Sequence, residues 1–132
     1  MDETEKINKI FAESKTVAVV GLSPKPDRAS HGVAGYLKKK GYKIVPVYPR
    51  EDTILGEKVY RSLGEIPEKV DTVLIFRKSE VVLPIVEEAI PLKPLAIWMQ
   101  EGIINKEASQ LAENCGIITV MDKCMYKEHC RL

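Results

Sequence analysis

Apolar residues recur along this chain with two different periods, and the two periods alternate from one end to the other. Helical spacing comes first, over residues 3–13, where Ile7, Ile10 and Phe11 share one face. Short β-branched runs then alternate with further amphipathic stretches. The runs predict five strands, at residues 16–20, 43–47, 71–76, 95–99 and 117–120.

Helices are predicted between these strands, because apolar residues recur there at intervals of three and four. The first of them, over residues 30–40, is expected to end at Gly41. Ser79 and Asn105 are expected to cap two later helices. Strict alternation of strands and helices predicts right-handed crossovers and a parallel sheet that is covered on both faces.

We therefore expect an α/β, Rossmann-like fold, with a doubly wound five-stranded parallel sheet, three α/β/α layers and the strand order 3-2-1-4-5. Residues 1–132 are enough for one such domain, and we expect the helix over residues 1–14 to pack on it. In this kind of sheet a ligand lies beyond the carboxyl ends of the strands, where the strand order reverses. The strand tips are therefore the candidate site.

Composition limits the class of protein. A net charge of +1, with 45% apolar and 30% charged residues, suits a globular protein and provides no basic field for nucleic acid. No apolar run approaches the ~20 residues that span a bilayer, and the acidic N-terminus does not resemble a signal peptide. Three widely spaced cysteines argue against a secreted disulfide framework. We expect a cytoplasmic protein that binds neither nucleic acid nor membrane, and a protein partner stays open.

The tip of the first strand carries the most informative residues. The candidates in this segment are Gly21, Leu22, Ser23, Lys25, Arg28 and Ser30. A glycine directly after the strand lets the backbone approach a phosphate group, although a glycine that serves only the turn is the alternative. We expect the backbone N–H groups after Gly21 and the start of the next helix to hold a pyrophosphate. Arg28 can bind phosphate oxygens through two parallel hydrogen bonds.

The tips of the other strands add cations and aromatic rings. The second strand ends in Val47, Tyr48, Pro49 and Arg50, where an NAD site normally carries an acid for the ribose hydroxyls. A ligand other than NAD is indicated, with Arg50 the natural partner of an additional ribose phosphate. Arg77 follows an unbroken apolar strand and is the next candidate cation. The remaining candidates are Phe76, Lys78, Trp98, Met99 and Gln100, with the Trp98 ring either part of a groove wall or a core residue.

Together these segments resemble the small, single-domain CoA-binding protein family, which is similar to the CoA-binding domain of succinyl-CoA synthetase α subunits and other acyl-CoA synthetases. The matching segments are residues 19–23, 26–28, 41–49, 54–60, 75–80, 97–102 and 120–125. Tyr48 stands where many members have Asn, and Lys123 stands where Arg is usual. The resemblance implies coenzyme A, free or acylated, as the cofactor, and it implies a carrier, sensor or regulatory module.

Residues that carry catalysis are not evident. Cys124, His129 and Cys130 fit no familiar zinc spacing, so we expect no metal site, and Cys124 is the only thiol at a strand tip, where a cofactor would lie. In the acyl-CoA synthetases the chemistry depends on a phosphorylated histidine in a further domain, so the resemblance implies binding and not a complete enzyme. Two alternatives stay open: an NADP-dependent reductase in which Arg50 binds the 2′-phosphate, and an interaction protein that has kept the fold without a ligand.

Overall fold

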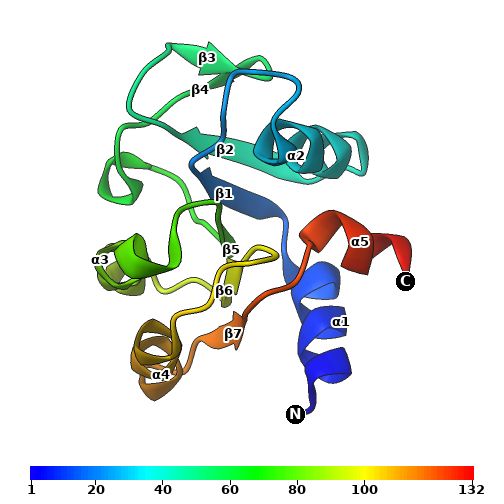
Figure 1. Cartoon of the computed structure of the whole chain (residues 1–132), viewed down its shortest axis with the longest axis vertical. Coiled ribbons are helices and arrows are strands. Elements are labelled where there is room, and N and C mark those ends of the chain that lie inside the picture. Colours follow the sequence, from blue (N-terminus) through cyan, green and yellow to red (C-terminus); the bar gives the residue numbers. More distant parts are fainter.

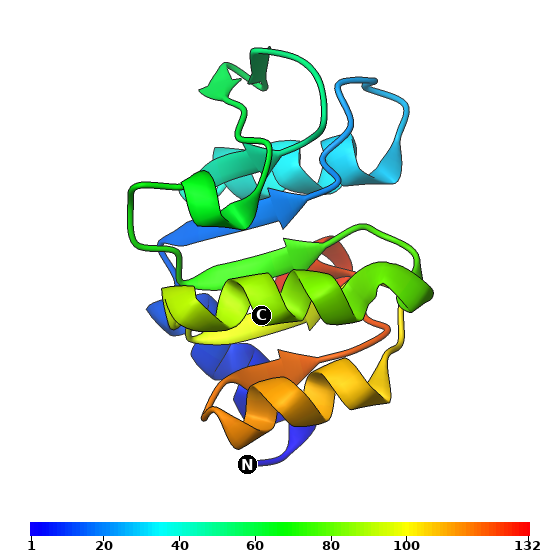
Figure 2. The ribbon, with the colours of Figure 1, turned by 90° about the vertical axis from the view of Figure 1, so that its left-hand side faces the viewer.

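The computed structural model describes residues 1–132 and confirms the α/β fold. Five parallel strands form the main sheet, in the order β2-β1-β5-β6-β7. They are β1 (Thr16–Val20), β2 (Lys43–Val47), β5 (Thr72–Ile75), β6 (Ala96–Met99) and β7 (Ile118–Val120). Figure 2 shows the strands running in one direction, so their carboxyl ends lie at the same end of the sheet.

Helices cover both faces of the sheet (Figure 1). The first face carries α1 (Glu3–Glu13), α2 (Ala29–Lys39) and α5 (Met125–Cys130), and the second carries α3 (Val82–Ala89) and α4 (Lys106–Asn114). The rest of the ordered elements are the hairpin β3 (Thr53–Ile54) and β4 (Glu57–Lys58) and the 3₁₀ turns η1 (Leu63–Glu65), η2 (Ser79–Val81) and η3 (Ile90–Leu92). None of the helices has the length and apolar character that crossing a membrane requires.

The alternation of side chains along the strands builds a core on each face. In β1, Val17 and Val19 pack toward the face of α1 and α2, whereas Ala18 and Val20 pack toward the face of α3. All four side chains are buried, as expected for a strand inside a sheet that is covered on both sides. This double burial explains the continuous β-branched runs in the sequence.

The strand order differs from the predicted 3-2-1-4-5 in the placement of one strand. Counted along the chain, the five main strands have the order 2-1-3-4-5, because the third of them, β5, pairs with β1 and not with β2. Pro46 explains why β2 lies at the edge, since proline has no N–H for a second neighbouring strand. The outer side of β2 is lined by Tyr60, whose N–H donates to the Pro46 carbonyl at 3.0 Å. The reversal point therefore lies between β1 and β5.

The predicted helix ends had different outcomes. Asn105 caps α4 as predicted, because its Oδ1 accepts the N–H of Ala108 at 2.9 Å. Ser79 does not cap α3, which is a correction: Ser79 begins η2, and its Oγ accepts the N–H of Ile104 at 3.0 Å. Ser79 thus ties the start of α3 to the loop after β6.

Candidate functional site

A cleft of about 470 Å³ opens at the carboxyl ends of β1, β2 and β5, where the strand order reverses. This is the place where open α/β sheets bind their ligands. Six of the predicted site residues line it: Gly21, Val47, Tyr48, Pro49, Phe76 and Arg77. Further lining residues are Val20, Arg61, Ser62, Ile85 and Glu88.

Gly21 is the most closely packed point of the cleft. Its φ of +88° lies in the left-handed region, and a Cβ atom there would stand 2.6 Å from the carbonyl oxygen of Phe76 and 3.0 Å from Cδ of Arg77. Its N–H donates to the carbonyl of Val47 at 2.9 Å. Gly21 therefore joins the tips of three strands, and both its conformation and its contacts exclude a side chain.

The loop between Gly21 and α2 presents free backbone donors. The N–H of Ser23 donates to Oγ of Ser30 at 3.0 Å, and the N–H of Lys25 donates to Oγ of Ser23 at 3.1 Å, so the loop is held by its own serines. The backbone N–H groups of Leu22, Ala29 and Ser30 donate to no atom of the protein, but Leu22 is fully buried in the core, which corrects its prediction as a site residue. The unpaired N–H groups of Ala29 and Ser30 lie at the N-terminus of α2, an arrangement that is suited to an anion.

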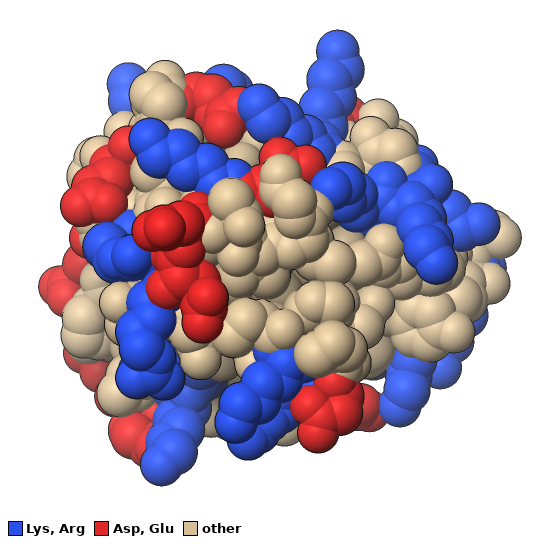
Figure 3. Space-filling model, turned by 90° about the horizontal axis from the view of Figure 1, so that it is seen from above, with Lys and Arg blue, Asp and Glu red and all other residues tan.

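The three predicted phosphate ligands are exposed arginines without an acidic partner. Arg77 lines the cleft, Arg28 precedes α2, and the guanidinium of Arg50 lies 5.9 Å from the ring of Tyr48. Arg131, at the other end of the chain, is paired with a glutamate. Figure 3 looks onto the end of the molecule that carries β3, β4 and α2, where basic side chains project among acidic ones and no uniform basic face forms.

Trp98 and Met99, predicted as site residues, are fully buried. The Trp98 ring packs against Phe11 at a centroid distance of 5.6 Å, and its indole N–H donates to the carbonyl of Lys123 at 2.8 Å. Met99 lies in the core of the opposite face. Because a fully buried side chain has no surface for a ligand, we correct the prediction: both are core residues, and the proposed site leaves them out.

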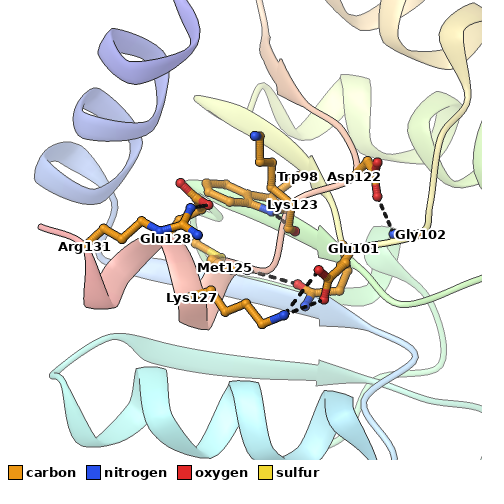
Figure 4. Close-up of polar contacts among 10 residues, drawn as sticks. Trp98, Glu101, Gly102, Asp122, Lys123, Met125, Lys127, Glu128 and Arg131 are labelled. Atoms are coloured by element: carbon orange, nitrogen blue, oxygen red, sulfur yellow. Dashed lines mark hydrogen bonds and ion pairs between the residues drawn. The ribbon is translucent and has the colours of Figure 1, made fainter.

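The C-terminal segment covers the carboxyl end of β6 (Figure 4). Oε1 of Gln100, a further predicted site residue, accepts the N–H of Met125 at 3.2 Å, and Gln100 is buried. Nζ of Lys127 lies 3.1 Å from Oε1 of Glu101, so α5 is also tied to the loop after β6. The open part of the site therefore belongs to β1, β2 and β5. Lys78, the last of the predicted residues, is exposed next to Arg77.

Arg61, Ser62, Ile85 and Glu88 are cleft residues that the sequence interpretation missed. Arg61 and Ser62 belong to an irregular segment without hydrophobic periodicity, so no pattern marks them. Glu88 is in α3, and its Oε1 accepts the N–H of Leu63 at 3.0 Å, which ties α3 to η1.

Groups with shifted pKa values gather where α2 meets α5. His129 lies against the rings of Phe11 and Tyr36, with centroid distances of 5.0 and 5.4 Å. Burial, and then the charge of Lys40, lower the pKa of His129. A hydrogen bond with Cys130, together with burial, raises the pKa of Tyr36 to about 12, and the Tyr36 hydroxyl lies 2.7 Å from Nδ1 of His129.

Metal ligands and reactive thiols do not gather at the cleft. No group of three or more His, Cys, Asp or Glu side chains lies close enough together to hold a metal ion. Cys115, Cys124 and Cys130 are free, and Cys124, the thiol at a strand tip, is only 8% exposed. The cleft itself is therefore lined by two arginines, the carboxylate of Glu88 and apolar walls.

Known proteins similar to this chain identify its family. Residues 15–130 match the family described as CoA binding domain. The chain belongs to that family. The uncharacterized protein YneT of Bacillus subtilis is 40% identical over 124 residues, which cover 94% of this chain and 92% of YneT. A solved structure, a hypothetical protein from Pyrococcus horikoshii, has a TM-score of 0.94 and 39% identity, and covers 99% of this chain and 92% of its own.

Larger relatives contain this fold as a small part. The ADP-forming acetate–CoA ligase of Methanocaldococcus jannaschii is 30% identical over 80 residues. The match covers 61% of this chain but only 11% of the ligase. The similarity therefore concerns one portion of that enzyme and not its whole length.

Proposed function

We propose that this protein binds coenzyme A, free or acylated, at the carboxyl ends of β1, β2 and β5, and that it serves as a carrier, sensor or regulatory module. The observation that carries the proposal is the match to the CoA binding domain over residues 15–130. A cleft at the reversal point of the sheet, lined by an arginine without an acidic partner, supports the same ligand.

The pyrophosphate of CoA is proposed to lie at the loop between β1 and α2. Free N–H groups at Ala29 and Ser30 would donate to its oxygens, and the positive end of the α2 dipole favours the charge. Lys25 and Arg28 stand on the same loop and would supply cations. Gly21 lets the start of this loop lie directly against the backbone of Phe76, where a side chain would not fit.

The other parts of CoA are assigned by the chemistry of the walls. Arg77 in the cleft is proposed to bind a phosphate oxygen, and Arg50 at the tip of β2 is proposed to bind the 3′-phosphate. The apolar surfaces of Val47, Tyr48 and Phe76 suit adenine or the pantetheine chain. These assignments follow the positions of the side chains around one cleft.

Several features weigh against a nicotinamide cofactor. The loop after β1 has Gly21 but carries Ser23 where the dinucleotide fingerprint has its second glycine. The tip of β2 has Arg50 where an acid would bind the ribose of NAD.

The similarity to acetate–CoA ligases supports coenzyme A as the ligand, but no reaction is proposed from it. The reason is that the shared portion is a small part of those enzymes.

Isothermal titration calorimetry with CoA, acetyl-CoA, NADP and NAD tests the proposal. We expect one molecule of CoA or acetyl-CoA to bind per chain, with an affinity at least about tenfold above that for NADP, because only CoA matches both the loop and the arginines. Tighter binding of NADP would indicate the reductase. Absence of binding by all four compounds would indicate an interaction protein.

A further inference from the structure

Arg61 stands at a junction that no sequence pattern predicted. The preceding residue, Tyr60, extends the sheet beyond β2: its N–H donates to the carbonyl of Pro46, and its carbonyl accepts the N–H of Tyr48, each at 3.0 Å. The N–H of Arg61 donates to Oε1 of Glu65 at 3.0 Å, which fixes the direction in which its side chain leaves the backbone. Arg61 is therefore anchored on a backbone that is itself tied to β2.

A single nitrogen of Arg61 cross-links the loop that follows β2. Nη1 lies within hydrogen-bond distance of the carbonyl oxygens of Tyr48, Arg50 and Glu51, at 3.1, 3.0 and 2.9 Å, and its two N–H groups are shared among these three acceptors. Glu51 has a φ of 72°, in the left-handed region that residues with side chains rarely adopt. By binding these three carbonyls, the charged Arg61 side chain stabilises a loop conformation that the loop residues would not prefer alone.

The surroundings of Arg61 distinguish it from an ordinary surface arginine. Its guanidinium forms no ion pair with Asp or Glu, so the loop carbonyls are its partners. Glu88 lines the same cleft, but its carboxylate accepts the N–H of Leu63. The charged group of Arg61 therefore binds the backbone of the loop that contains Tyr48 and Arg50.

We propose that Arg61 is a positioning residue: it preforms the loop from Tyr48 to Glu51, and through that loop it places Arg50 for the 3′-phosphate of the ligand. This inference rests on the proposed function. A loop that is ordered before binding loses less conformational freedom when the ligand arrives, so Arg61 contributes to affinity through the loop that carries Arg50. Its hydrogen bond reaches the backbone carbonyl of Arg50, and a change of the Arg50 side chain leaves that bond in place.

A double-mutant cycle tests the proposal. The proteins are wild type, Arg61→Gln, Arg50→Gln and the double variant, with Arg131→Gln as the matched control, because Arg131 lies on the C-terminal segment and is paired with Glu128. Calorimetry gives the affinity of each protein for CoA and for dephospho-CoA, which lacks the 3′-phosphate. Thermal unfolding shows that each variant is folded at the temperature used.

Arg61→Gln is expected to weaken CoA binding about tenfold in the wild type and by less than about threefold in the Arg50→Gln protein. The effect is smaller in the second protein because the Arg50 guanidinium, which Arg61 is proposed to position, is already absent. The affinity for dephospho-CoA is expected to fall much less on Arg61→Gln than the affinity for CoA. Equal losses in the two backgrounds, or equal losses for the two ligands, would overturn the positioning role. If Arg61→Gln does not fold, Arg61→Lys takes its place in the same cycle.

The outcome for the wild type separates this inference from the proposed function. If the wild type binds CoA and Arg61→Gln binds it equally well, the positioning role fails while the proposed function stands. If the wild type does not bind CoA, both fail.

Discussion

Gly21 lies so close to Phe76 that a Cβ atom on Gly21 would stand 2.6 Å from the Phe76 carbonyl oxygen. Gly21→Ala must therefore move β1 away from the tip of β5, and it must also hold an alanine at a φ of +88°. We expect the free energy of unfolding to fall by about 2–5 kcal/mol, the sum of left-handed strain and overpacking. Urea unfolding measures the loss.

Gly32→Ala is the matched control for Gly21→Ala. Gly32 lies within α2, and a Cβ atom there meets nothing within 4 Å. Alanine is expected to stabilise this helix by about 0.5–1 kcal/mol. A Gly21→Ala protein as stable as Gly32→Ala would contradict the tight contact between β1 and β5.

Ser30 is expected to matter more than Ser23 for the loop after β1. Ser30 is buried and its Oγ accepts the N–H of Ser23, whereas the Ser23 hydroxyl serves the less buried N–H of Lys25. Ser30→Ala is expected to lower the free energy of unfolding by about 1–3 kcal/mol and to weaken CoA binding, with smaller effects for Ser23→Ala. Unfolding and calorimetry on the two variants give the comparison, and the reverse order would contradict this role of Ser30.

Trp98 is expected to act on stability alone. Trp98→Phe removes the donor to the Lys123 carbonyl, a part-buried hydrogen bond of 2.8 Å, and is expected to lower the free energy of unfolding by about 1–3 kcal/mol. The affinity of the folded protein for CoA should not change. Weaker CoA binding by folded Trp98→Phe would place Trp98 nearer the ligand than its burial indicates.

His129 is expected to make stability depend on pH. Burial and Lys40 lower its pKa below the ordinary value of 6.5, so the unfolded chain holds the proton more tightly than the folded one. The free energy of unfolding should therefore fall as pH drops below 6.5 toward the lowered pKa, and His129 should have no effect above that window.

Urea unfolding between about pH 5 and pH 8 measures this dependence in wild type and in His129→Asn, which lacks the titrating ring. The difference between the two proteins isolates His129 from the carboxylates that titrate in the same range. If the free energy of unfolding changed with pH in the same way in wild type and His129→Asn, the pH dependence could not be assigned to His129.

Much of the fold follows from local patterns. The period of the apolar residues predicted the five main strands and the helices α1 to α4, because burial on one or both faces leaves a direct mark on the sequence. The strand order was predicted less well, although Pro46 marks β2 as an edge strand. Proline removes one hydrogen-bond donor from the ladder, and this signal places β5 on the other side of β1.

The site was harder to predict, for two physical reasons. Trp98 and Gln100 follow the strand-tip rule, but the C-terminal segment folds back over β6 and buries them, which no local pattern reveals. Arg61 owes its contacts to carbonyls that converge only because Glu51 adopts a positive φ. Contacts of this kind depend on loop conformation and not on periodicity.

The affinity of arginine variants for CoA tests most directly whether the ligand lies at the carboxyl ends of β1, β2 and β5. Arg77 lines the cleft, Arg28 precedes α2, and neither has an acidic partner, whereas Arg131 is the paired control at the C-terminus. We expect Arg28→Ala and Arg77→Ala each to weaken CoA binding about tenfold or more, with unchanged unfolding, because each loses a hydrogen bond to a charged group. Arg131→Ala should bind like the wild type. If Arg28→Ala and Arg77→Ala also bind CoA like the wild type, the ligand does not lie at this end of the sheet.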